Sequence, residues 1–145
     1  MSQAKNNIVI VTSEFPPQPG GIGNHAYNLA LYLSKNGYKV QIIADQRSET
    51  GDEEMVFDQG LGFEVVRIKR YDFRFKMYIT RMVVTYRSLI NASHVIATGK
   101  FSLWNVALCS LFNPCQTIAV IHGTEVNFKT FILRKSIDIA VSYTH

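Results

Sequence analysis

The sequence predicts an α/β domain with a Rossmann-like, doubly wound and mostly parallel sheet of about six to seven strands. Three observations lead to this fold class. Short, continuously apolar runs recur along the chain, as expected for strands buried on both faces of a parallel sheet. Segments with a helical apolar period separate these runs, and a glycine-rich loop joins the first run to the first helical segment.

The first predicted strand is Ile-Val-Ile-Val at residues 8–11, and further runs of this kind follow it. They are residues 40–44, 63–68, 95–97, 117–121 and 137–141. Residues 47–62 are rich in charge and glycine, which predicts a mobile loop between the second and third strands.

The helical segments are indicated by apolar residues that recur every three or four positions. In the first segment Ala26, Leu29, Ala30 and Leu33 follow this spacing, and Asn36-Gly37 predicts a left-handed stop. The second segment has its apolar positions at Ile79, Met82, Val83, Tyr86 and Ile90. The third, residues 102–112, is apolar nearly all round, as expected for a helix packed on both sides.

Length and composition limit the function classes. The chain has 145 residues, the size of one domain, and its net charge of +4 favours anionic partners without being a nucleic-acid signature. Cys109 and Cys115 lack metal-ligand spacing and are predicted to be free thiols of a reducing compartment. The polar N-terminus predicts no signal peptide and no run is long enough to span a bilayer, so we expect a cytoplasmic protein.

The glycine-rich loop at residues 13–25 is the first candidate site. The first amides of a helix have no acceptor within the helix, and glycines without Cβ atoms let a diphosphate approach them closely. The residues concerned are Gly20, Gly21, Ile22, Gly23 and Asn24. A proline-stiffened turn that only connects strand to helix is the competing explanation.

Two other nucleotide motifs fit less well. Asp45 ends the second predicted strand, about twenty residues past the glycines, where a dinucleotide enzyme binds ribose. The glycines do not follow the tight dinucleotide turn, however, so an NAD-binding fragment stays the weaker alternative. A P-loop is excluded because no Lys-Ser or Lys-Thr pair closes the loop.

Two motifs together resemble a known family. Pro-Gly-Gly-Ile-Gly at residues 19–23, with the helix after it, and His-Gly-Thr-Glu at residues 122–125 are similar to the N-terminal domain of family 4 retaining glycosyltransferases, which have the GT-B fold. The resemblance spans nearly the whole chain. It implies two Rossmann-like domains across a cleft, the N-terminal one holding most of the acceptor. Residues 1–145 match only this acceptor-side domain, so we expect one domain that lacks the C-terminal nucleotide-sugar domain and is inactive by itself.

The resemblance also implies roles for the loop residues. Gly20 and Gly21 would place backbone amides beside the donor diphosphate, where negative charge develops during transfer. Ile22, Gly23 and Asn24 would line the loop where acceptor and phosphate meet.

The second motif is implied to face the same cleft. His122 is the candidate catalytic residue, placed against the donor sugar, with a turn-satisfying histidine as the competing explanation. Thr124 and Glu125 are candidate acceptor contacts, with helix capping as the other role for Glu125. The leaving phosphate itself would help to deprotonate the acceptor hydroxyl, and neither a cofactor nor a metal is expected.

Cations and aromatic residues alternate between residues 67 and 87, which is typical of a surface that faces anionic lipid. Arg70, Arg74, Lys76 and Arg81 are the candidate membrane residues. A solvated helix face with its aromatic residues in the core explains the pattern equally well.

The expected function is thus one half of a hexosyltransferase that moves a sugar from a nucleotide sugar to a saccharide or lipid-linked acceptor. Its expected partners are these substrates, the C-terminal domain and an anionic membrane that it contacts peripherally, but no nucleic acid. A non-catalytic sugar- or nucleotide-binding module is the alternative.

Overall fold

Five parallel strands form the sheet of the computed structural model, which describes residues 6–113 and 115–121. The strands are β1 (Asn7–Thr12), β2 (Lys39–Asp45), β3 (Glu64–Ile68), β4 (His94–Thr98) and β5 (Gln116–Val120). Their order across the sheet is β3-β2-β1-β4-β5, so the chain reverses its direction of travel between β1 and β4. This is the doubly wound arrangement that the alternating pattern predicts.

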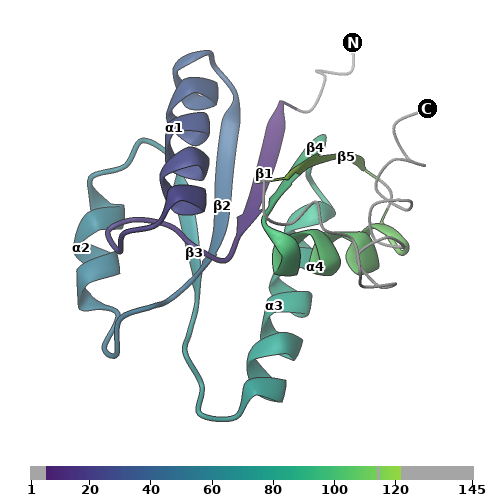
Figure 1. Ribbon diagram of the computed structural model, residues 1–145. Coiled ribbons are helices and arrows are strands. Elements are labelled where there is room, and N and C mark those ends of the chain that lie inside the picture. Colours follow the sequence, from purple (N-terminus) through teal and green to yellow (C-terminus); the bar gives the residue numbers. More distant parts are fainter. Residues whose placement is uncertain (1–5, 114, 122–145) are drawn as a thin grey trace.

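Four helices cover the two faces of the sheet: α1 (Gly21–Lys35), α2 (Asp52–Gln59), α3 (Arg74–Leu89) and α4 (Lys100–Ser110). Figure 1 shows α1 and α2 on one side of the sheet and α3 and α4 on the other. Neighbouring residues of β1 face opposite cores, since Ile10 packs with Ala26 and Ala30 of α1 while Val11 packs with Leu103 and Val106 of α4. Burial on both faces explains why the sequences of the central strands β1, β2 and β4 are largely apolar.

The strand predictions are confirmed for the five strands that the structure describes, with ends that differ by at most one residue. The sixth, residues 137–141, lies outside the described residues. The predicted stop of the first helix is also confirmed, because α1 ends at Lys35 and Gly37 has a φ of 87°, in the left-handed region. Cys109 and Cys115 are free thiols, as predicted, and burial raises the pKa of Cys109 to about 11.

The mobile loop predicted for residues 47–62 is wrong, because this segment contains α2. Glu54 holds the chain before the helix in place. Its carboxylate is buried and accepts hydrogen bonds from the Arg47 amide at 2.9 Å and from the Ser48 amide at 2.8 Å, and a further one from the Ser48 hydroxyl. Burial raises the pKa of Glu54, but these hydrogen bonds outweigh burial and lower the pKa to about 2.

The helix predicted from Ile79 to Ile90 is confirmed as α3, but the face that it buries differs from its apolar stripe. The stripe residues are 41 to 51% exposed: Ile79, Met82, Val83, Tyr86 and Ile90. The buried residues of α3 are instead Arg81, Thr85 and Leu89. A hydrogen bond helps to explain why Thr85 faces inward, since the buried Asn105 side chain of α4 donates to the Thr85 hydroxyl at 2.7 Å.

Candidate functional site

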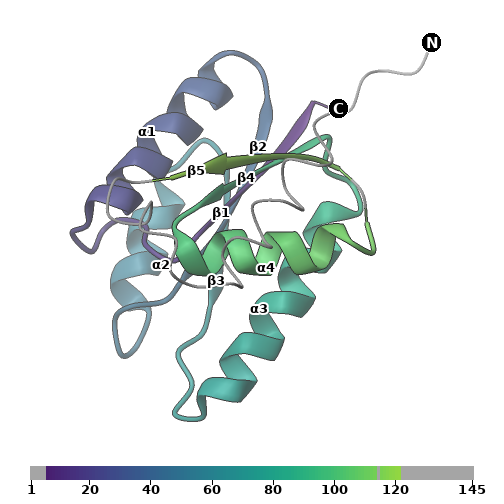
Figure 2. The same cartoon turned by 45° about the vertical axis from the view of Figure 1, so that its right-hand side comes forward.

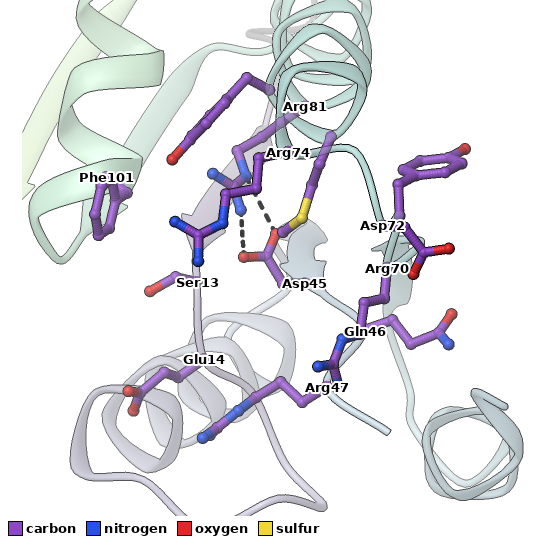
Figure 3. A pocket seen from close by; sticks show the side chains of 13 residues that line it. Ser13, Glu14, Asp45, Gln46, Arg47, Arg70, Asp72, Arg74, Arg81 and Phe101 are labelled. Atoms are coloured by element: carbon purple, nitrogen blue, oxygen red, sulfur yellow. Dashed lines mark hydrogen bonds and ion pairs between the residues drawn. The ribbon is translucent and has the colours of Figure 1, made fainter. Parts of the chain in front are cut away.

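A cleft of about 710 Å³ opens at the carboxyl ends of the strands. Its lining comes from the segments that follow β1, β2 and β3 and from the first turns of α3 and α4 (Figure 3). Open parallel sheets bind their ligands at this edge, beside the point where the strand order reverses. The cleft is therefore the candidate site of the described residues.

An ion pair forms the floor of this cleft. The Arg81 guanidinium of α3 contacts both carboxylate oxygens of Asp45, which ends β2, and Nε of Arg81 lies 3.2 Å from Oδ1 of Asp45 (Figure 3). The exposed fractions are 10% for the Arg81 side chain and 12% for that of Asp45. Burial raises the pKa of Asp45, and the hydrogen bond and charge of Arg81 offset this only in part.

This pair corrects one expectation and weakens another. Arg81 is buried and neutralised by Asp45, so it cannot be part of the predicted membrane surface. Arg70, Arg74 and Lys76 are exposed, as such a surface requires. Arg81 already contacts both oxygens of Asp45, which makes this carboxylate a poorer acceptor for the ribose hydroxyls of a dinucleotide.

The loop between β1 and α1 is fixed by the side chains beneath it. Phe15 is fully buried, and its ring lies 6.0 Å from that of Tyr27 in α1 and 6.5 Å from that of Phe57 in α2. Arg67 of β3 stacks on Phe15 and donates to the Pro16 carbonyl at 2.6 Å, while Asp58 accepts two hydrogen bonds from the same guanidinium. The loop is therefore a rigid edge of the cleft.

The glycines of this loop have different surroundings. Gly20 precedes α1 and accepts the first hydrogen bond of the helix, from the Asn24 amide at 3.0 Å. A Cβ on Gly20 would collide with the Glu14 carboxylate, whereas one on Gly21 would meet nothing within 4 Å. Gly23 is buried, and a Cβ there would lie 3.0 Å from backbone atoms of the loop. Gly23 thus has a packing role, and the exposed Gly21 leaves the start of α1 open.

Some of the predicted site residues lie within the described part of the chain and others do not. The loop residues 20–24 lie at the start of α1, at the same edge of the sheet as the cleft, but none of them is among the residues that line it. His122, Thr124 and Glu125 lie outside the described residues. Sequence reasoning missed the cleft-lining Glu14 and Arg47, although their places directly after the first two predicted strands could have indicated them.

Within residues 6–113 and 115–121, no group of His, Cys, Asp or Glu side chains is placed to hold a metal ion. None of the helices in the same ranges is both long and apolar enough to cross a membrane.

Comparison with known families agrees with this geometry. Residues 19–141, most of the chain, match the model of Glycosyltransferase Family 4. The chain belongs to this glycosyltransferase family. The matched range includes all four helices and every residue that lines the cleft except Ser13 and Glu14. No curated protein matches the chain.

Proposed function

We propose that this chain is the acceptor-side domain of a retaining glycosyltransferase that transfers a sugar from a nucleotide sugar to a saccharide or lipid-linked acceptor. The cleft is the observation that supports this proposal. It lies at the carboxyl ends of the strands of a family 4 domain and has the volume of a small-ligand site. We place the protein in the cytoplasm, where nucleotide sugars are the donors, and the proposal needs no cofactor and no metal.

In this proposal the start of α1 stabilises the leaving diphosphate. The first amides of α1 have no acceptor within the helix, and the exposed Gly21 allows close approach to them. At Gly20 the Glu14 carboxylate covers the backbone, so this side chain would have to move before a diphosphate could reach the Gly20 amide. Preorganised donors of this kind stabilise charge that develops on the leaving group. Ile22 and Asn24 would contact the acceptor side of the same loop.

His122 is the proposed catalytic residue, against the donor sugar near the reacting carbon, and Thr124 and Glu125 are proposed acceptor contacts. The leaving phosphate would take the proton of the acceptor hydroxyl as the new glycosidic bond forms on the same face of the sugar. This accounts for retention without a pair of catalytic carboxylates.

The experiment is the change His122→Ala in an enzyme that carries both domains. We expect sugar transfer to fall by about two to four orders of magnitude with an unchanged unfolding transition. The matched control is His94→Gln, at the amino end of β4 and thus at the opposite edge of the sheet, which should retain activity. Near-normal transfer by His122→Ala would contradict the assignment of His122.

A second experiment separates an enzyme half from a non-catalytic module. The 145-residue chain should show no transfer by itself, and activity should appear when a C-terminal nucleotide-sugar domain of the family is joined to it. Absence of transfer from the joined protein across a panel of nucleotide sugars and acceptors would favour the binding module.

We also propose that α3 contacts an anionic membrane peripherally. Phe73 and Phe75, at the start of α3, are 68% and 63% exposed and pack on each other at 6.2 Å between ring centres. The helix has no acidic residue and carries exposed Arg74 and Lys76 beside these rings. Aromatic residues flanked by cations suit the headgroup region of an anionic bilayer. Figure 2 shows this end of α3 projecting away from the sheet.

Vesicle sedimentation tests this contact. Binding to vesicles that contain phosphatidylglycerol should exceed binding to pure phosphatidylcholine, and Phe73→Ser and Phe75→Ser should each weaken it about tenfold. Phe112→Ser is the matched control, because Phe112 is 78% exposed but lies beyond the far end of α4. Equal loss from all three variants, or no preference for anionic lipid, would contradict the proposal.

A further inference from the structure

We propose that the cleft binds an anionic group of the acceptor, a phosphate or a carboxylate, through the guanidinium groups of Arg70 and Arg74. This inference rests on the proposed function, because it names the chemical class of acceptor that the same cleft would take.

Positive charge exceeds negative charge among the residues that line the cleft. Its charged residues are four arginines and three acids: Arg47, Arg70, Arg74 and Arg81, with Glu14, Asp45 and Asp72. Arg81 and Asp45 neutralise each other. Arg47 donates to the Pro19 carbonyl at 3.1 Å, and its guanidinium and the Glu14 carboxylate both lie beside Gly20. Two of the four arginines, Arg47 and Arg81, are therefore already held by contacts within the protein.

Arg70 and Arg74 are not used in this way. Both side chains are exposed, and within the described part of the chain neither has an ion pair or a hydrogen bond through its guanidinium. α3 contains no acid that could neutralise Arg74, and Asp72 is the one acid of the lining left against these two arginines. In Figure 3 the side chains of Arg70 and Arg74 lie on opposite sides of Asp45.

Guanidinium groups are suited to this task. Each carries five N–H donors in a planar fork that matches the oxygens of a phosphate or carboxylate. Such charge-assisted hydrogen bonds are about twice as strong as those between neutral groups. An anion that enters the cleft would meet the guanidinium donors of Arg70 and Arg74, which the fold leaves open, whereas Arg81 is already held by Asp45.

Aromatic rings in the same lining indicate that the anion belongs to a sugar. Tyr71, Tyr78 and Phe101 line the cleft, and Tyr78 and Phe101 are 44% and 53% exposed. Aromatic faces pack against the C–H faces of pyranose rings, a contact that a free inorganic anion cannot make. Cations and rings together therefore favour an anionic saccharide over a neutral one.

The first test measures binding by NMR titration of the 145-residue chain. The probes are glucose 1-phosphate, glucuronate, glucose and UDP. We expect at least one of the two anionic sugars to bind more tightly than glucose, and which of the two binds identifies a phosphate or a carboxylate as the preferred group. Arg70→Gln and Arg74→Gln should each weaken that binding about tenfold, and the two together about a hundredfold.

Arg87→Gln is the matched control, because Arg87 lies in the last turn of α3 and lines a different hollow of the surface. Equal weakening by Arg87→Gln would indicate a general charge effect and would overturn the proposal. So would glucose binding as tightly as both anionic sugars. Loss of UDP binding in the arginine variants with sugar binding unchanged would assign the two residues to the donor and would overturn it too.

The second test uses an enzyme that carries both domains. The double change Arg70→Gln/Arg74→Gln should raise KM for the charged acceptor while KM for the donor stays constant, and a rise in the donor KM alone would overturn the proposal. If no transfer is observed with any acceptor, the proposed function fails. The binding titration still decides whether the two arginines hold an anionic sugar.

Discussion

The buried pair of Asp45 and Arg81 offers the sharpest test of the structure, through a double-mutant cycle. The changes are Asp45→Asn, Arg81→Met and both together. Each side chain is about nine-tenths buried, and two hydrogen bonds join them. At about 4 Å and an effective dielectric constant of about 20, the attraction between the charges is about 4 kcal/mol.

Loss of water around both groups cancels much of this attraction, so the intact pair adds little net stability. Removing one partner is different, because the other charge then stays buried without a counter-charge. Each single change should lower the free energy of unfolding by about 3–5 kcal/mol. The double change removes both charges and should cost less than either single one, which gives a coupling energy of at least about 3 kcal/mol.

Urea unfolding followed by circular dichroism measures these values, provided that the m-value stays constant across the four proteins. A pH series adds an independent check. Burial raises the pKa of Asp45 in the folded state, so in Arg81→Met the folded state favours the protonated carboxyl. The destabilisation by Arg81→Met should therefore grow as the pH rises above the ordinary Asp range near pH 4, and shrink as the pH falls toward it.

Two results would refute this reasoning. One is a pair of single variants that each lose less than about 1 kcal/mol, with a coupling energy below about 0.5 kcal/mol. The other is a destabilisation by Arg81→Met that does not depend on pH. Either would mean that water reaches the pair and that it does not form a buried floor for the cleft.

Three further predictions concern the segments around the cleft. Glu54→Gln should lower the unfolding free energy, measured by urea unfolding, by about 2–3 kcal/mol at pH 7. Because the pKa of Glu54 in the folded state is about 2, this difference should be present above pH 4.5 and vanish as the pH falls toward 2. Gly23→Ala should cost about 1–3 kcal/mol in thermal unfolding, because its Cβ would press on loop backbone, whereas Gly21→Ala should be neutral or slightly stabilising. Arg67→Met should speed amide exchange at Phe15, Gln18 and Gly20, the loop residues that carry an N–H, with little change in β4; unchanged exchange at these three amides would contradict the role of Arg67 as the support of the loop.

The strand and helix order could be predicted from the sequence because the central strands β1, β2 and β4 are buried on both faces. That burial requires continuous apolar runs such as residues 8–11 and 40–44, which are easy to recognise. The position of the glycine loop at the start of α1 followed from the same logic. The family resemblance then named the domain, and the match over residues 19–141 confirms the family.

The segment at residues 47–62 could not be predicted in the same way. Its order depends on Glu54, whose buried carboxylate binds amides six and seven residues earlier in the chain. A sequence pattern shows Glu54 only as one acid among several in a charged stretch, which is typical of a loop. The burial of Glu54, and with it the helix, arises from tertiary packing.

The orientation of α3 shows the same limit and bears on function. Its apolar stripe predicts that Ile79, Met82 and Val83 face the core, yet the helix is turned so that Arg81 and Thr85 face inward. Each of these two has a buried polar partner on another element, Asp45 on β2 or Asn105 on α4, and a rotation that buried the stripe would leave those partners unsatisfied. The exposed stripe is thus a consequence of building the cleft floor from a charged pair. It leaves apolar side chains in water beside the exposed Phe73 and Phe75, an arrangement that becomes favourable once a bilayer or another apolar surface covers it.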